Sequence, residues 1–286
     1  FTMYRGRISF TAPMFWFFFF FVTFTIGGVT GVLMAVPALD FQVHNTLFLV
    51  AHFHNVIIGG VVFGLFAGIT HWFPKIFGFK LHDKLGRYSA ILWQIGFILA
   101  FIPLYILGLM GAVRRLDSYD DVTWQPFFIV SGIGVLVIAS GVAMFLLQVT
   151  YSIWKRKELR DLTGDPWDGR TLEWSVPSPA PHYNFAVIPE VAERDEWWHR
   201  KQTGKTTHTR NEYDDIWLPR NSAGGIFVAI AAGLAGFGII WHLWWLVALA
   251  VVCMIAIIIR QTLNDESEYR VSANELFHED QKRRAL

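Results

Sequence analysis

The sequence predicts an all-α, polytopic membrane bundle of about six transmembrane helices. Hydrophobic residues make up 53% of the 286 residues and aromatic residues 16%. Charged residues make up only 16% of this chain, whereas they make up about 25% of ordinary soluble domains. The mean hydropathy is positive, at +0.38. Long apolar stretches recur along the chain, and a helix of about 20 such residues crosses the hydrocarbon core of a bilayer.

Six segments are long and apolar enough, or nearly so, to span a membrane: residues 12–36, 44–73, 88–110, 127–154, 224–241 and 243–260. The last two are short and are separated by little more than His242, which predicts a tight helical hairpin. We therefore expect a four-helix core at 1–154, a polar linker at 155–222, a hairpin at 223–261 and a polar tail at 262–286. The opening residues, FTMYRGRISF, lack a signal-peptide pattern and suggest a fragment of a larger bundle.

Composition also excludes some classes of function. The net charge of +1 is too small to indicate nucleic-acid binding. The single cysteine, Cys253, lies in an apolar stretch, so the sequence contains neither a disulfide framework nor a CxxC metal site.

Basic residues predict the orientation, because they mark the cytoplasmic side of membrane proteins. They gather before the first span, between the second and third, and after the fourth: Arg5, Arg7, Lys75, Lys80, Lys84, Arg87, Lys155, Arg156 and Lys157. This pattern predicts that both ends of the chain are cytoplasmic.

One loop breaks the charge rule. The loop at 111–126 is predicted to face outward, yet it contains Arg114 and Arg115. The acidic residues that follow, Asp117, Asp120 and Asp121, offer one explanation, which is local neutralisation. The other is an anionic ligand at the outer membrane boundary, because guanidinium groups bind carboxylates well.

The stretch HNTLFLVAHFHN contains three histidines, His44, His52 and His54, in one of the most apolar parts of the chain. Successive helical residues turn by about 100°, so residues two apart point to nearly opposite sides. His52 and His54 therefore cannot bind the same metal ion from a regular helix. A lone buried histidine is more often a hydrogen-bonded core residue, but ionisable residues within a span favour a functional role.

Neutral imidazole is the usual axial ligand of haem iron. Small residues after the histidines, among them Gly59, Gly60 and Gly64, would let a planar group or another helix approach closely. Two haems flanking one helix would explain histidines on opposite sides. Haem propionates at the outer boundary would explain Arg114 and Arg115.

These motifs resemble a known family. HNTLFLVAHFHN, HWFPKIFG, GLMGAVRRL and DPWDGRTLEW…PSPAPHYNF are similar to the carboxyl-terminal half of subunit I of haem–copper terminal oxidases. The resemblance covers nearly the whole chain. It implies that His52 is the axial ligand of the high-spin haem, that His54 is an axial ligand of the low-spin haem, and that Arg114 and Arg115 bind haem propionates.

The resemblance also implies that His44 and Asp40 belong to the propionate region, where water and departing protons are handled. The copper ligands of the family lie on earlier helices and have no counterpart in this chain. His71 is about 28 Å from His52 along a helix, so we expect a boundary residue there and not a copper ligand.

Asn45 indicates the electron donor. Cytochrome c oxidases usually have Asp after the outer histidine, where the pair helps to hold magnesium, whereas Asn resembles the bo-type ubiquinol oxidases. GRTLEW and the hairpin at 224–260 resemble that type too. The resemblance thus implies a low-spin haem b, a high-spin haem of o or a type, copper in the complete subunit, and subunits II, III and IV as partners.

We therefore expect part of the catalytic subunit of a respiratory oxidase in a bacterial inner membrane. The complete subunit would reduce dioxygen to water with ubiquinol as donor and translocate protons. A cytochrome c oxidase is the nearest alternative. A proton-linked transporter is an alternative of another class, and a purely structural subunit is a third.

Overall fold

The computed structural model describes residues 3–4, 6, 8–204 and 212–284. Arg5 and Arg7, used above to predict the orientation, lie outside these residues. The chain divides into two compact units, Phe1–Pro181 and His182–Leu286. The division into four segments expected from the sequence stays a prediction.

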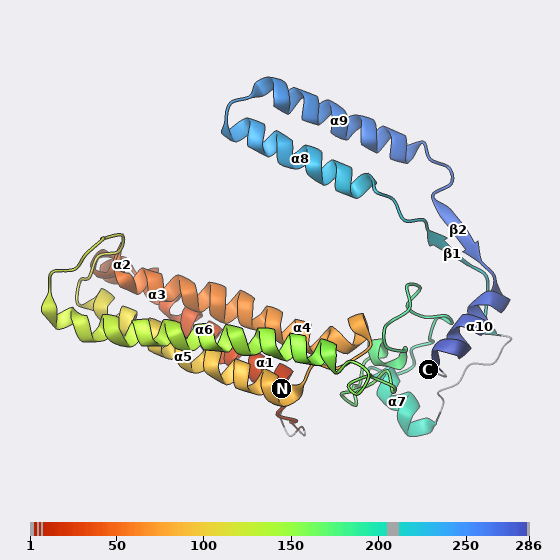
Figure 1. Ribbon diagram of the computed structural model, residues 1–286, viewed down its shortest axis with the longest axis horizontal. Helices are drawn as coiled ribbons and strands as arrows, with labels where there is room; N and C mark the ends of the chain where they lie inside the picture. Colours follow the sequence, from red (N-terminus) through yellow and green to blue (C-terminus); the bar gives the residue numbers. More distant parts are fainter. Residues whose placement is uncertain (1–2, 5, 7, 205–211, 285–286) are drawn as a thin grey trace. The chain divides into compact units, whose positions relative to one another are not determined.

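The first unit is a bundle of long helices that run side by side (Figure 1). The helices are α1 (Ala12–Met34), α2 (Pro37–Val43), α3 (Leu47–Val56), α4 (Phe63–Phe77), α5 (Asp83–Leu109) and α6 (Gln125–Trp154). A π-helix, Ile57–Val62, joins α3 to α4, so that Leu47–Phe77 forms one span. A short 3₁₀ turn, Val122–Trp124, precedes α6.

Five helices in the described part of the chain are long and apolar enough to cross a membrane: Ala12–Met34, Leu47–Phe77, Asp83–Leu109, Val122–Trp154 and Trp244–Thr262. The remaining predicted segment, 224–241, forms a shorter apolar helix of 17 residues, Gly224–Ile240. The predicted fold class, a helical membrane bundle, is confirmed. All six predicted segments are helical, with boundaries that differ by a few residues.

Local chemistry explains where the helices begin and end. Pro13 stands at the start of α1, where a missing N–H costs nothing. The Thr46 side chain accepts a hydrogen bond from the Phe48 amide and caps α3, so the second span begins at Leu47 and not at residue 44. His82 caps α5 in the same way, so this helix begins at Asp83, five residues before the predicted start at 88. Gly78, with φ at 78°, ends α4 in a left-handed turn.

The sequence did not reveal the π-helix that follows the two histidines. Its glycines touch α1: a Cβ on Gly59 would lie 2.6 Å from a Thr23 methyl group, and one on Gly60 would lie 2.7 Å from the Phe24 ring. This packing explains why both positions lack side chains. π-helical turns within α-helices are frequent at functional sites, and this one begins three residues after His54.

Segment 155–181 packs against the end of α4 and the turn that follows. Phe79 and Arg160 form an isolated antiparallel bridge, the Lys75 ammonium donates to the Val176 carbonyl, and the Trp167 indole donates to the His71 carbonyl over 2.9 Å. The first part of the predicted linker is therefore an ordered cover at this end of the bundle.

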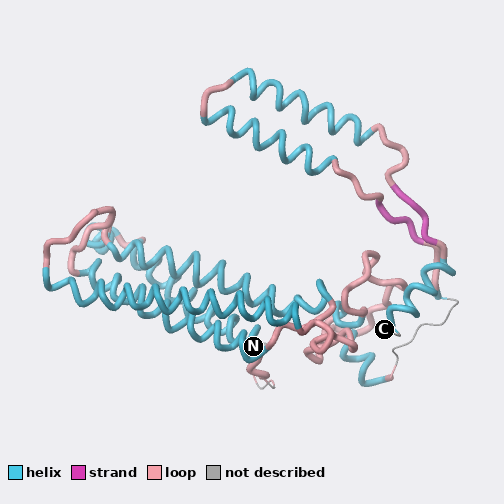
Figure 2. The backbone as a smooth tube through the Cα atoms, viewed as in Figure 1, coloured by secondary structure: helices cyan, strands magenta, loops and turns pink. Residues whose placement is uncertain are grey.

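The second unit combines a helical hairpin with a small polar base (Figure 2). Its elements are α7 (Glu196–Thr203), β1 (Ile216–Pro219), α8 (Gly224–Ile240), α9 (Trp244–Thr262), β2 (Glu268–Val271) and α10 (Ala273–Arg284). The strands pair antiparallel, with Ile216 opposite Val271, and thereby join the two ends of the hairpin. Buried Tyr213, Val271 and Leu276 form the core of the base.

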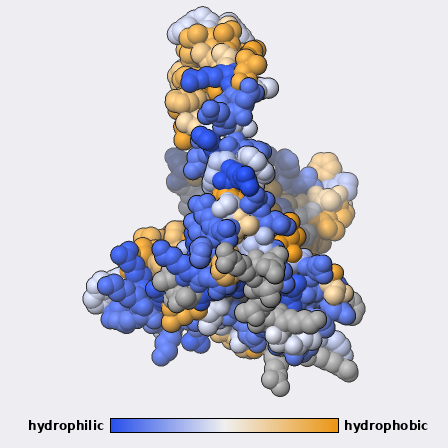
Figure 3. Space-filling view, turned by 90° about the vertical axis from the view of Figure 1, so that its right-hand side faces the viewer, coloured by the Kyte–Doolittle hydropathy of each residue, from blue (hydrophilic) through white to orange (hydrophobic). Residues whose placement is uncertain are grey.

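Charge and burial distinguish the polar base of the second unit from its helical hairpin. The Tyr213 hydroxyl donates to the Asp280 carboxylate over 2.7 Å, and burial beside this carboxylate raises the pKa of Tyr213 to about 12. Large apolar side chains on α8 and α9 stay exposed, including Ile226, Ile240, Trp245 and Val252. Figure 3 shows hydrophobic side chains on the hairpin and mainly hydrophilic ones on the polar base.

Helices α5 and α6 approach each other through glycines. A Cβ on Gly134 would lie 2.3 Å from the Ala100 amide nitrogen, and one on Gly96 would lie 2.6 Å from the Ile138 nitrogen. Such small residues let helix backbones meet in a membrane.

We predict that Gly134→Ala destabilises the bundle by about 1–3 kcal/mol, because the added methyl group forces α5 and α6 apart. Gly132→Ala is the matched control, since a Cβ there would meet no atom within 4 Å. Thermal inactivation of the purified complex measures the effect. Equal midpoints for the two variants would contradict this account of the packing.

Candidate functional site

The His52 side chain lies against α1. It is half-buried, and its Nδ1 lies 3.0 Å from the Thr30 hydroxyl. The ring edge occupies the space that a side chain on the neighbouring glycine would need, because a Cβ on Gly31 would lie 2.9 Å from Cε1 of His52. The contact between these helices therefore requires both the imidazole and the glycine.

The His54 side chain meets a different helix. Its ring lies 4.5 Å from the ring of Phe53 and 4.5 Å from that of Phe101 on α5, stacked on both. Its Nδ1 lies 2.8 Å from the Val50 carbonyl, one turn earlier on α3. The two histidines thus contact opposite neighbours, α1 and α5, as helical spacing predicts, and they cannot share one metal ion.

The hydrogen bonds also indicate which ring nitrogens could bind iron. The Val50 carbonyl can only accept, so Nδ1 of His54 must hold the proton. A neutral ring then has a lone pair on Nε2. The contact of His52 with Thr30 and that of His54 with Val50 both involve Nδ1, and His52 also hydrogen-bonds the Gly27 backbone carbonyl. A neutral imidazole held through Nδ1 fits the chemistry of an axial haem ligand.

At the end of the bundle that α2 caps, a second group of predicted residues comes together. The His44 ring lies 3.5 Å from the Asp40 carboxylate, with 62% and 42% of the side chains exposed. The next residue, Asn45, accepts two hydrogen bonds from the Arg114 guanidinium, over 3.2 Å from Nε and 2.8 Å from Nη2. Asp40, His44 and Arg114 therefore occupy one corner of the first unit.

Backbone pairing builds this corner. The Arg114 amide donates to the Asn45 carbonyl and the Leu47 amide to the Ala112 carbonyl, both over 2.9 Å. Asn45 has φ at 55° and Arg115 has φ at 69°, a region that asparagine tolerates better than most residues. The turn after α5 is thus fixed to the start of α3, and Arg115 follows as an exposed side chain.

The aspartates after the double arginine have other contacts. Among the described residues, no ion pair joins Arg114 or Arg115 to Asp117, Asp120 or Asp121. Asp121 instead accepts from the side chain and the amide of Thr123, and these bonds lower the pKa of its carboxyl group.

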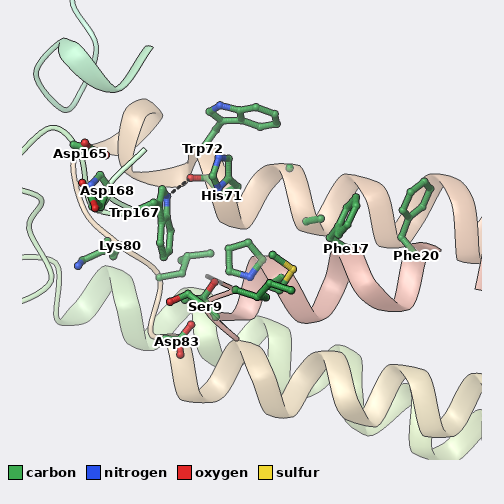
Figure 4. A pocket seen from close by; sticks show the side chains of 18 of the residues that line it. Ser9, Phe17, Phe20, His71, Trp72, Lys80, Asp83, Asp165, Trp167 and Asp168 are labelled. Atoms are coloured by element: carbon green, nitrogen blue, oxygen red, sulfur yellow. Dashed lines mark hydrogen bonds between the residues drawn. The ribbon is translucent and has the colours of Figure 1, made fainter. Parts of the chain in front are cut away.

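His71 lies near the far end of the same span. Its ring is parallel to that of Trp167, with centroids 5.9 Å apart, and it lines a cavity of about 1220 Å³ together with Trp72, Asp165 and Asp168 (Figure 4). No group of three His, Cys, Asp or Glu side chains in the described parts of the chain could hold a metal ion. That His71 is a boundary residue stays a prediction.

The sequence did not identify the residues that hold the histidines. Thr30, Gly31, Phe101 and Tyr105 come from two other helices, so no local spacing connects them to His52 or His54. The indication in the sequence was Thr30 itself, because a hydroxyl inside an apolar membrane helix needs a hydrogen-bond partner.

We predict that Asn45→Gly speeds tryptic cleavage at Arg114 and Arg115 about 2- to 5-fold, the factor expected from losing a hydrogen bond at an exposed site. Glycine keeps the positive φ and removes only the acceptor. Asn45→Asp is the control, because it retains an acceptor oxygen for Arg114 and should cleave no faster than the natural sequence. Equal rates for all three proteins would contradict the role of this contact.

Comparison with known proteins gives a consistent result. Residues 1–137 match the family described as "Cytochrome C and Quinol oxidase polypeptide I". The chain is 48% identical over 279 residues to "Probable cytochrome c oxidase subunit 1" of Bradyrhizobium diazoefficiens, and 49% identical over 278 residues to "Cytochrome bo(3) ubiquinol oxidase subunit 1" of Buchnera aphidicola subsp. Acyrthosiphon pisum. It is also 39% identical over 285 residues to "Quinol oxidase subunit 1" of Bacillus subtilis.

These matches cover nearly all of this chain and less than half of each relative. The first two cover 96% of the chain and 42% of the relative, and the third covers 99% and 44%. The resemblance to subunit I of haem–copper oxidases inferred from the sequence motifs is confirmed: residues 1–137 match this family, and nearly the whole chain is similar to part of subunit 1 in each of these relatives.

Proposed function

We propose that the complete protein is the catalytic subunit of a respiratory terminal oxidase that reduces dioxygen to water with ubiquinol as electron donor and translocates protons. The main support is the arrangement of His52 and His54, which contact helices on opposite sides and each engage a partner through Nδ1. A single helix can in this way supply one axial ligand to each of two haems.

His52 would hold the iron of the high-spin haem, of o or a type, where oxygen is reduced. His54 would supply one axial ligand to the low-spin haem b, which passes electrons. Bound haem supplies the one-electron and oxygen chemistry. The protein holds and orients the rings: Thr30 and Gly31 contact His52, while Phe53 and Phe101 stack on His54. The copper ligands belong to the part of the subunit outside this chain.

The corner formed by Asp40, His44, Arg114 and Arg115 would bind the haem propionates. Two guanidinium groups favour carboxylates. Asp40 and His44 form an exposed pair beside them, suited to holding water and passing protons.

The electron donor rests on three features, which are Asn45, the GRTLEW motif and the hairpin of α8 and α9. Relatives of almost equal identity have names that include both donors, so cytochrome c oxidase remains the alternative. A proton-linked transporter is less well supported, because Leu47–Phe77 is a single uninterrupted span.

The protein is an integral membrane protein. We propose a bacterial inner membrane, with the Lys75–Lys80 end cytoplasmic on the positive-inside rule and the Arg114 end outside. Subunits II, III and IV of the oxidase would be its partners.

We predict that His52→Ala abolishes oxygen reduction and the high-spin haem spectrum but retains the low-spin haem. Removing one ligand leaves the other iron site intact, because the two rings contact different helices. Purified complexes are compared by reduced-minus-oxidised spectra and oxygen uptake. His242→Ala, in the turn of the hairpin, is the control. Full activity with both haems in His52→Ala would refute the assignment.

Arg115→Gln should shift the midpoint potential of at least one haem and leave assembly largely intact, because a cation beside a propionate changes the free energy of the nearby iron charge. A spectroelectrochemical titration measures the shift. Arg170→Gln, on segment 155–181, controls for a general loss of positive charge. An unchanged potential in Arg115→Gln would rule out the propionate role.

A further inference from the structure

Three helices of the first unit bring polar side chains together at Thr30. Its hydroxyl oxygen lies 3.0 Å from Nδ1 of His52 on α3 and 3.1 Å from the Tyr105 hydroxyl on α5. It also lies 2.9 Å from the Ile26 carbonyl and 3.0 Å from the Gly27 carbonyl of its own helix. Tyr105 is buried, with 8% of its surface exposed. Polar groups in an apolar bundle must satisfy one another.

The number of protons determines the direction of each hydrogen bond. A hydroxyl has one proton to donate and two lone pairs that accept. The carbonyls of Ile26 and Gly27 can only accept, so the Thr30 proton points to them, as is common for threonine in helices. The two lone pairs then accept from Tyr105 and from Nδ1 of His52. The Gly27 carbonyl is a second acceptor for the His52 ring. This arrangement places the imidazole proton on Nδ1 and the free lone pair on Nε2.

Packing holds the same three groups in place. The Tyr105 ring packs edge-on against Phe48, with centroids 4.8 Å apart. The His52 ring edge lies where a Cβ of Gly31 would be, 2.9 Å from Cε1. The imidazole therefore cannot tilt further toward α1 without moving that helix.

We propose that Thr30, supported by Tyr105, is a positioning residue that acts beside the Gly27 carbonyl to fix the tautomer and orientation of the His52 imidazole, and so sets how strongly it donates to iron. The inference rests on the proposed role of His52 as the ligand of the high-spin haem. An acceptor on the distal ring nitrogen raises the basicity of a metal-bound imidazole. The pair would thereby stabilise the oxidised iron.

The test uses the complete oxidase purified with each of four substitutions. Thr30→Val removes the hydroxyl at constant shape, Thr30→Ser restores it, and Tyr105→Phe removes only the supporting hydroxyl. Thr25→Val is the matched control, because Thr25 lies on the same helix and bonds only the Phe21 carbonyl at an exposed position. Resonance Raman spectroscopy measures the iron–histidine stretching frequency of the reduced high-spin haem, and redox titration measures both haem potentials.

Thr30→Val is expected to lower the stretching frequency, raise the potential of the high-spin haem and leave that of the low-spin haem unchanged. Oxygen reduction should fall about 10- to 100-fold, the usual effect of losing such a partner. Thr30→Ser should restore the natural frequency, Tyr105→Phe should shift it in the same direction as Thr30→Val, and Thr25→Val should not shift it.

An unchanged frequency and potential in Thr30→Val would overturn the inference. If Thr30→Val yields no complex, an unchanged stretching frequency in Tyr105→Phe would overturn the inference instead. Failure of the proposed function looks different: the unsubstituted complex would then show no iron–histidine band, or the band would survive in His52→Ala.

Discussion

The rotation of an α-helix determines how this chain would serve the two haems that we propose. Residues two apart turn by about 200°, so a single His-Phe-His element directs two imidazoles to opposite sides. His52 contacts α1, and His54 contacts α5. The other features of the first unit follow from this requirement, because each ring needs its own supporting helix and its own hydrogen-bond acceptor.

The supports differ in kind on the two sides. His54 bonds its own helix through the Val50 carbonyl and stacks on aromatic rings, so its position depends on α3 and on Phe101. His52 depends on a hydroxyl from another helix and on the absence of a side chain at Gly31. The environment of the proposed high-spin haem iron is therefore sensitive to small movements of α1. The environment of the proposed low-spin haem iron depends mainly on α3 itself and on Phe101.

Glycines and turns set the spacing that these contacts need. Gly59 and Gly60 let the π-helix touch α1, and Gly96 and Gly134 let α5 meet α6. At the α2 end, Asn45 fixes the arginine turn to the start of α3. Helix packing and the corner of charged residues are thus parts of one scaffold, which positions the rings in the middle and the cations at the boundary.

Much of this architecture could be predicted from hydropathy, because the bilayer imposes a minimum length on each apolar segment. The helix boundaries required caps that composition does not reveal, such as Thr46 and His82. The sequence also gave no indication of α2, the β1–β2 pair, or the π-helix. These features depend on contacts between distant segments.

The two histidines and two arginines were selected from the sequence because charged or ionisable residues are rare in spans and on the outer side. Their partners could not be selected in this way. Thr30 and Tyr105 are 75 residues apart, and only the folded bundle brings them together. Helical spacing predicted that His52 and His54 face different neighbours, but the identity of those neighbours required the structure.

The most direct test of the account is the haem content of the intact complex. The complex is purified through a tag on this chain, and a reduced-minus-oxidised spectrum is recorded with a pyridine haemochrome assay. The account predicts two haems, one low-spin and one high-spin, and a b-type with an o-type haem would favour ubiquinol as donor. An a-type haem would favour the cytochrome c oxidase alternative. A complex without haem would contradict the central claim that His52 and His54 each hold an iron.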